Sequence, residues 1–283
     1  MTFVVTGATG HLGRLVVEAM LTRGVAPDEI VATGRRIETL GDLAAAGVQV
    51  RRADYDDPAS LDAAFADAER LLLVSGTEFG TRVGQHRNAI DAAVRAGVRH
   101  IAYTSGPRAD TAPLPVNPDH WATEQLLQAS GVTWTALRDN WYSEGYLPDV
   151  ARSRDTGEIA SATGSGRVAS ASRRDFAEAA AVVLTTAGHE NAVYELGGDV
   201  AWSYDELAQL LSSIVGRPVV HRHLTPAERR ASLVAAGLPE GVAEFVTAID
   251  TGIAAGALAE VTGTLSRLIG RPTTPLRDTL APT

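Results

Sequence analysis

The amino-acid sequence predicts an α/β protein built on a doubly wound parallel sheet, with a smaller α/β lobe toward its C-terminal end. Three observations support this prediction. Short apolar segments alternate with amphipathic segments through the first half of the chain. The connections between them are short, so right-handed crossovers would place helices on both faces of the sheet. A glycine-rich turn joins the first predicted strand to the first predicted helix.

Six strands are expected in the first half of the chain, each marked by a short apolar run. They cover residues 2–6, 29–34, 48–53, 70–75, 100–105 and 132–138. The helices between them carry apolar residues at helical spacing, and several begin at a proline or end at a glycine. They cover residues 12–23, 37–46, 58–68, 80–96 and 118–130. Because strands and helices alternate, the strands should run parallel.

The alternation changes beyond about residue 140. Loops and short strands are expected over residues 157–166, with further strands over 193–196 and 219–223 and helices over 175–186, 203–215, 226–236 and 241–255. We therefore expect a sheet domain over residues 1–140 and a smaller lobe over residues 141–283. Some segments of that lobe should return to the sheet. The lobe is the natural place for a substrate.

Composition excludes several kinds of chemistry. The chain contains no cysteine, and all 25 of its basic residues are arginine. Disulfides, thiolate nucleophiles, Schiff bases and P-loop lysines are therefore ruled out. The net charge of −9 argues against nucleic acid as a partner, because affinity for nucleic acid comes mainly from neutralised phosphates. No apolar run is long enough for a bilayer and the chain starts directly with a strand, so we expect a cytoplasmic protein without signal peptide or membrane segment.

The turn after the first predicted strand contains three glycines in the run Thr6-Gly7-Ala8-Thr9-Gly10-His11-Leu12-Gly13. Gly7 allows a sharp turn, Gly10 allows the backbone to approach a pyrophosphate, and Gly13 allows the helix to pack closely on the sheet. The amide groups at the start of the helix then face the phosphates. We therefore predict a Rossmann-type dinucleotide-binding turn. Its expected cofactor contacts are Gly7, Thr9, Gly10, His11, Leu12 and Gly13.

Residues at the ends of the other strands indicate which dinucleotide binds. Arg35 follows the second strand, where NAD enzymes carry an acidic residue for the ribose, and a guanidinium matches the 2′-phosphate of NADP. We therefore expect NADP(H) as the cofactor. Asp54, at the end of the third strand, would accept a hydrogen bond from the adenine amino group. Small residues at the ends of the fourth and fifth strands leave room for the ribose and nicotinamide: Ser75, Gly76, Thr104 and Ser105.

Longer segments of the sequence are similar to one family. The glycine turn, the run Gln85-His86-Arg87-Asn88 and residues 96–105 resemble the NmrA-like atypical short-chain dehydrogenases. Residues 137–144 and 268–273 extend the resemblance over nearly the whole chain. The similarity is greatest to the bacterial members that reduce quinones with NADPH and to the triphenylmethane reductases. The resemblance implies a Rossmann domain, a small C-terminal lobe, NADPH in the cleft between them and a flat aromatic acceptor.

The sequence departs from this family at one position of the implied acceptor site. After the sixth strand the family usually has Leu-Arg-Asn, whereas this chain has Asp139 in place of the asparagine. A carboxylate cannot donate a hydrogen bond unless it is protonated, so an anionic Asp139 facing the acceptor would favour a cationic substrate. Asn140 could take over the role of the asparagine. The expected substrate contacts are Asp139, Asn140 and Trp141, and the identity of the acceptor is left open.

The chain lacks the Tyr-x-x-x-Lys pair through which ordinary short-chain dehydrogenases exchange a proton with an alcohol or carbonyl. An acceptor that takes hydride without an enzyme-placed acid is therefore favoured, and quinones and cationic dyes qualify. Catalysis would then consist mainly of orientation on the nicotinamide. His120 could still donate a proton near neutral pH, and Tyr142 could line an aromatic wall beside Trp141. His120 and Tyr142 are therefore the candidate catalytic residues.

Other functions stay open. A non-catalytic regulator of the NmrA type could use the same fold to sense NADP, and an isomerase or epimerase would leave its cofactor unconsumed. The expected partner is a small aromatic molecule, with a homodimer left open. His221 and His223 alternate on a predicted strand. Without a nearby cysteine or acidic ligand they are interpreted as surface residues, and no metal site is expected.

Overall fold

The computed structural model describes residues 1–281, which divide into two compact units. Unit 1 consists of three segments, Met1–Ala109, Pro118–Asp139 and Arg173–Glu195. Unit 2 consists of Asp110–Asn117, Asn140–Ser172 and the rest of the described chain from Leu196 on. The chain therefore passes between the units more often than a single boundary at residue 140 would require. Its segment Arg173–Glu195 supplies the last helix and most of the last strand of the sheet.

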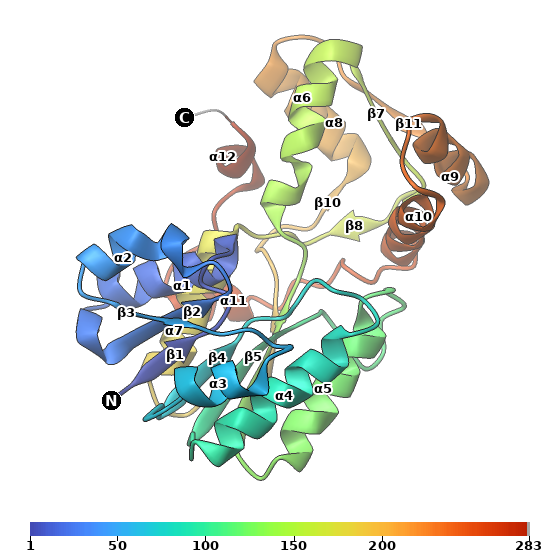
Figure 1. The fold of residues 1–283 in the computed structure, drawn as a ribbon. Coiled ribbons are helices and arrows are strands. Elements are labelled where there is room, and N and C mark those ends of the chain that lie inside the picture. The colour runs from blue at the N-terminus through green and yellow to red at the C-terminus, as the bar shows by residue number, and fades with distance from the viewer. Residues whose placement is uncertain (282–283) are drawn as a thin grey trace. The chain divides into compact units, whose positions relative to one another are not determined.

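Unit 1 contains a seven-stranded sheet in the order β3-β2-β1-β4-β5-β6-β9 (Figure 1). The strands are β1 (Phe3–Val5), β2 (Ile30–Gly34), β3 (Gln49–Arg52), β4 (Arg70–Leu73), β5 (His100–Ser105), β6 (Thr133–Asp139) and β9 (Ala192–Leu196). The first six pair in parallel. Their order is that of a doubly wound Rossmann sheet, in which the strand order reverses beside β1. The fold class predicted from the sequence is confirmed.

Helices cover both faces of this sheet. They are α1 (His11–Thr22), α2 (Gly41–Ala45), α3 (Pro58–Ala64), α4 (Arg82–Arg95), α5 (Asn117–Ala129) and α7 (Arg173–Thr185). Figure 1 shows α3, α4 and α5 on one face, and α1 packs against α7 on the other. Alternate strand residues such as Val4, Leu71 and Ile101 are buried against the first group of helices. The strands β1, β2 and β4 are buried along nearly their whole length, which explains why they read as apolar runs, whereas β3 at the edge of the sheet is only partly buried.

Two helical segments of the structure differ from the expectation. The helix expected over residues 37–46 is a 3-10 turn, Ile37–Leu40, followed by the short α2. Gly41 at their junction is a poor helix former, which explains the interruption. The helix α6 (Leu147–Thr156) was not predicted, because only Val150 and Ser153 of its residues are buried and its apolar periodicity is weak.

Unit 2 is built from short strands and helices around its own core. The strand β7 (Glu158–Ser161) pairs in parallel with β11 (Val220–His223), and β8 (Arg167–Val168) pairs antiparallel with β10 (Trp202–Ser203). Besides α6, the helices are α8 (Tyr204–Val215), α9 (Pro226–Ala235), α10 (Glu240–Ala254), α11 (Thr264–Ile269) and α12 (Leu276–Leu280). Tyr146 packs edge to face against both Trp202 and Tyr204 within the core of this unit.

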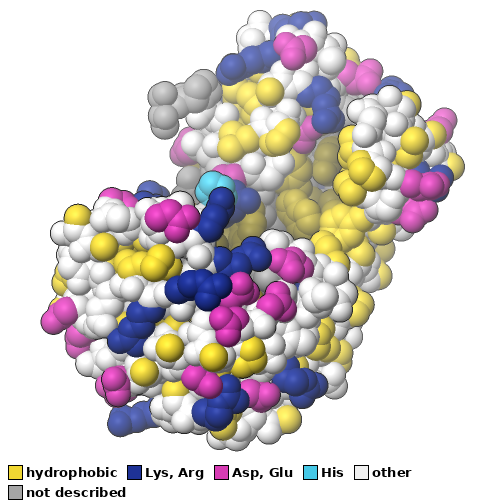
Figure 2. Space-filling view, viewed as in Figure 1, with side chains coloured by type: hydrophobic (Ala, Val, Ile, Leu, Met, Phe, Trp, Pro, Cys, Tyr) yellow, Lys and Arg dark blue, Asp and Glu magenta, His cyan; other side chains and the backbone are white. Residues whose placement is uncertain are grey.

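Two further observations concern the charges on the surface and the lengths of the helices. Figure 2 shows arginine and acidic side chains interspersed over the visible face of unit 1, rather than one continuous basic surface. Among the described residues, no helix has both the length and the apolar character that crossing a membrane would require.

Candidate functional site

The glycine turn of unit 1 has a backbone shape that other residues would not permit. Gly7 has φ of +61°, in the left-handed region that glycine adopts without strain. A Cβ atom on Gly13 would lie 2.5 Å from the carbonyl oxygen of Gly7. Gly13 therefore allows the helix to pack against the turn itself, a closer contact than the helix–sheet packing expected from the sequence. Gly34, at the end of β2, is required as well, because a Cβ there would lie 2.5 Å from the side chain of Thr9.

The N-terminus of α1 is left open by this turn. Gly10 is its N-cap, no side chain caps the helix, and its first turn holds no acidic residue. The first amide groups of a helix have no partner within the helix, and the helix dipole makes their position electropositive. His11 is exposed and Leu12 is buried in this first turn. The arrangement provides a binding place for an anion such as a diphosphate.

Arg35 lies beyond the end of β2 with 64% of its side chain exposed. Its Nη1 atom lies 3.2 Å from Oε1 of Glu78, which follows β4. An exposed pair of this kind contributes little free energy, so the guanidinium can exchange Glu78 for a phosphate group. Asp54, at the end of β3, accepts a hydrogen bond from the amide of Asp56 at 3.2 Å and so shapes its own turn.

The ends of β4 and β5 bring three of the predicted residues together. The amide of Ser75 donates to Oγ1 of Thr104 at 2.9 Å. The amide of Gly76 donates to Nε2 of His86 at 3.0 Å, which leaves the ring proton on Nδ1 to donate to Oγ1 of Thr123 at 2.9 Å. Burial, with the nearby charge of Arg82, lowers the pKa of His86 to about 3 and keeps its ring neutral. His86 therefore holds the loop after β4 in place.

His120 is buried in the same region. Its Nδ1 atom lies 2.8 Å from the hydroxyl oxygen of Tyr103 on β5. Burial, followed by the charges of Arg82 and His86, lowers the pKa of His120 to about 3. The ring is therefore neutral at pH 7, and the imidazolium donor expected from the sequence is not available in this environment. The physical reason is the cost of placing a charge where water is excluded.

A buried ion-pair network lies behind these residues and was not found by the sequence reasoning. Arg138 on β6 forms two hydrogen bonds with Glu124 on α5, at 2.9 and 2.7 Å, and one with Glu195 on β9 at 2.9 Å. Ser105 donates to the same Glu124 at 2.6 Å, so a residue predicted to contact the cofactor is used structurally. Burial alone would lower the pKa of Arg138, but its two carboxylate partners raise it above its usual range. The spacing of an arginine and a glutamate in the sequence gave no signal for this contact.

The residues expected to contact the acceptor follow β6. Asp139 is the last residue of the second segment of unit 1 and is buried. In unit 2, Asn140 donates from Nδ2 to the carbonyl of Leu258 at 3.2 Å and accepts from the amide of Trp141 at 2.7 Å. Both polar atoms of its side chain thus bond to backbone. Trp141 packs against the core of unit 2 and Tyr142 is half-buried.

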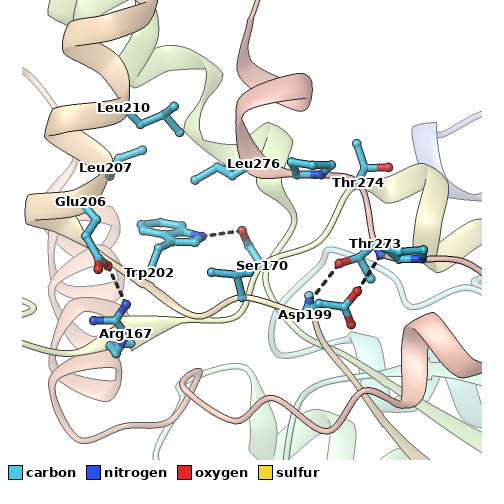
Figure 3. Close-up of a pocket in the computed structure, with 14 residues that line it drawn as sticks. Arg167, Ser170, Asp199, Trp202, Glu206, Leu207, Leu210, Thr273, Thr274 and Leu276 are labelled. Carbon is cyan, nitrogen blue, oxygen red and sulfur yellow. Dashed lines mark hydrogen bonds and ion pairs between the residues drawn. The ribbon is translucent and has the colours of Figure 1, made fainter.

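Unit 2 contains a cavity of about 490 Å³ (Figure 3). This volume is in the range of small-molecule sites. Trp202, Leu207, Leu210 and Leu276 provide apolar walls, and the indole nitrogen of Trp202 donates to Oγ of Ser170 at 3.0 Å. The polar rim includes the ion pair of Arg167 with Glu206 and the mutual bonds of Asp199 with Thr273, and none of the predicted substrate residues lines the cavity.

One expectation about unit 2 is wrong in part. His221 and His223 were interpreted as surface residues without a nearby acidic ligand, and His223 is indeed exposed. The side chain of His221 is 2% exposed, and Asp205 at the start of α8 lies against both rings. Asp205 is 16 positions away from His221 in the sequence. The fold brings Asp205 beside β11, and the residues next to the histidines in the sequence could not indicate this contact.

A doubly wound sheet with an uncapped glycine turn at β1 and an arginine after β2 defines a Rossmann-type nucleotide-binding protein. Residues 7–187 match the family described as NAD(P)H-binding. The chain belongs to this NAD(P)H-binding family, and the resemblance to NmrA-like reductases drawn from the sequence is confirmed.

Three relatives cover nearly the whole chain. Quinone oxidoreductase 2 of Escherichia coli (strain K12) is 45% identical over 98% of this chain and 96% of its own length. The crystal structure of the NADPH-dependent quinone oxidoreductase of Escherichia coli in complex with NADPH is 44% identical, with a TM-score of 0.95 and coverage of 99% of this chain and 98% of that one. The triphenylmethane reductase of Citrobacter sp. in complex with NADP(H) is 39% identical, with a TM-score of 0.93 and coverage of 99% of both chains.

Proposed function

We propose that the chain is a cytoplasmic NADPH-dependent oxidoreductase that transfers hydride to a quinone or a similar flat aromatic acceptor. The observation that carries the proposal is the 45% identity, over nearly the full length, to a quinone oxidoreductase. A regulatory role is not favoured, because these similar proteins are named as reductases. The absence of lysine agrees with an acceptor that needs no tyrosine–lysine pair.

The cofactor-binding end of unit 1 fits NADPH. The amide groups of His11, Leu12 and Gly13 would hold the diphosphate at the uncapped start of α1. The turn can approach the phosphates closely because Gly7 and Gly10 carry no side chain. Arg35 would leave Glu78 to bind the 2′-phosphate, since that ion pair is exposed. Thr9, Asp54, Ser75, Gly76 and Thr104 complete the proposed contacts, and Ser105 acts through Glu124.

Bound NADPH supplies the hydride, and the residues of the chain supply orientation. A quinone that gains a hydride needs one proton to become a hydroquinone, and water provides it. Neutral His120 is bonded to Tyr103, so an imidazolium acid takes no part in the proposal. We keep Asp139, Trp141 and Tyr142 as acceptor-facing residues, with the aromatic rings as a wall against which a flat acceptor stacks.

The test is turnover. Purified protein mixed with NADPH and a panel of quinones and cationic dyes should lose the absorbance of the reduced nicotinamide. Calorimetric titration of the same sample with NADPH should give saturable binding. Binding of NADPH without turnover of any acceptor would indicate a regulator instead of an enzyme. Absence of binding would contradict the assignment of NADPH as the cofactor. A homodimer is left open by the sequence, and sedimentation equilibrium of the purified chain would measure it.

A further inference from the structure

Three side chains of unit 2 that the proposed reaction does not use converge at one point. His221 and His223 lie on the same side of β11, because side chains alternate along a strand. Their ring centroids are 4.1 Å apart. Asp205, in the first turn of α8, places Oδ1 2.8 Å from Nδ1 of His221 and 3.1 Å from Nε2 of His223. None of the three lines the cavity of unit 2.

The arrangement has the dimensions of a metal centre. One ligand atom from each residue lies within 4.8 Å of the others. In a tetrahedral site with bonds of about 2.0–2.1 Å, neighbouring ligand atoms are roughly 3.4 Å apart. The two separations from Asp205 are slightly shorter, so a small rotation of the carboxylate would admit an ion. Asp205 and His223 each have 57% of the side chain exposed, so both can move and an ion can enter from solvent.

His221 is held as a metal-binding histidine usually is. Its Nε2 atom lies 2.9 Å from the buried hydroxyl of Ser161 on β7. When Nδ1 binds an ion, Nε2 carries the proton and can donate it to this hydroxyl, which fixes the tautomer and the ring orientation. Arg222, between the two histidines in sequence, points to Glu158 at 2.7 Å and faces away from them.

We propose that Asp205, His221 and His223 form a binding site for a divalent transition-metal ion, with Zn²⁺ as the best match. Two imidazoles and one carboxylate suit Zn²⁺, Ni²⁺ or Cu²⁺, whereas Mg²⁺ and Ca²⁺ prefer oxygen ligands alone. Three protein ligands leave a fourth position for water. The ion would link the start of α8 to β11. Along the chain, these two segments are separated by the whole length of α8. The proposal does not depend on the proposed reaction.

The test uses the full chain without an affinity tag, freed of metal by a chelator and without cofactor. Calorimetry with Zn²⁺ should show one site per chain, and Co²⁺ should give the visible spectrum of a tetrahedral complex. His223→Gln and Asp205→Asn change exposed side chains, so both proteins should fold. Each should lose more affinity than the roughly 10- to 100-fold expected for Ser161→Ala, which removes an outer partner. Asp155→Asn, at an exposed aspartate of α6, is the matched control and should bind as the unaltered chain does.

A stability measurement gives a second readout. Zn²⁺ should raise the melting temperature of the unaltered chain and of the control, because a ligand that binds the folded state stabilises it. The His223→Gln protein should show no such rise. Absence of a one-equivalent site, or equal Zn²⁺ affinity in the control and both altered proteins, would overturn the proposal. In that case the three residues form only a hydrogen-bonded cluster.

Discussion

The edge of unit 1 at the carboxyl ends of its parallel strands has two halves that use polar groups in opposite ways. The open half comprises the glycine turn and Arg35, where amide groups have no side-chain cap and the guanidinium is exposed. The pinned half lies at the ends of β4, β5 and β6 and contains His86, Ser105, His120, Glu124 and Arg138, which are buried and bonded to one another or to nearby groups. Uncapped or exposed groups are available to a ligand, and groups with buried partners hold the edge in shape. We therefore expect substitutions in the pinned half to reduce the stability of the fold, and substitutions in the open half to reduce binding of the cofactor.

The largest expected effect concerns Arg138. In Arg138→Met the carboxylate of Glu124, which is 0% exposed, would lose its cation. Breaking a buried pair in this way costs about 3–5 kcal/mol of unfolding free energy, which chemical denaturation would measure. Adding Glu124→Gln to the same protein should restore part of that loss. The matched control is Arg95→Ala, whose exposed pair with Asp62 is worth at most about 1 kcal/mol. Equal losses in the two proteins would show that the network does not hold the pinned half together.

The second expected effect is a dependence of stability on pH. Burial lowers the pKa of His86 and of His120 to about 3, against about 6.5 in the unfolded chain. Below pH 6.5 the unfolded state therefore binds more protons than the folded state, so stability is lost as the pH falls. Each histidine contributes up to about 1.4 kcal/mol per pH unit in this window.

Denaturation at pH 7.5 and 5.5 would measure this effect, and the two histidines together should account for roughly 3 kcal/mol. His120→Asn should show about half of the dependence that these two histidines cause, and NADPH affinity should change little. A dependence that the substitution leaves unchanged would mean that His120 is accessible to protons in the folded state. The pinned half would then be more accessible to solvent than its buried side chains indicate.

The difference between the halves also explains what the sequence could predict. The glycine turn follows backbone rules that act within eight neighbouring residues, so Gly7, Gly10 and Gly13 could be assigned from their spacing. The parallel, doubly wound sheet followed from the alternation of strands and helices. The pairing of Arg138 with Glu124 and Glu195 joins three elements far apart in the sequence, as does that of His221 with Asp205. Nothing local marks such contacts, and His120 was interpreted as a donor because its burial could not be read from the chain.

The third prediction tests the open half. Arg35→Ala should weaken NADPH binding by about 10- to 100-fold, since hydrogen bonds to charged groups contribute about 1.5–3 kcal/mol. NADH binding should change little, because NADH lacks the 2′-phosphate, and the unfolding free energy should stay the same. Calorimetric titration with both cofactors would measure the ratio, and Arg36→Ala provides the neighbouring control. Equal weakening of both cofactors would show that Arg35 does not contact the 2′-phosphate.

The smallest expected effect concerns Asp139, which the proposed function places beside the acceptor. This residue is buried at the end of β6, directly after Arg138, and an anionic side chain there would favour a cationic acceptor over an electron-rich quinone oxygen. Asp139→Asn restores a hydrogen-bond donor of similar size. We expect kcat/KM for neutral quinones to rise relative to that for cationic dyes by several-fold, which corresponds to about 1 kcal/mol. Steady-state rates with a matched quinone and dye would give this ratio. A ratio that does not move, in a protein of unchanged stability, would place residue 139 away from the acceptor and with the buried residues that only shape the edge.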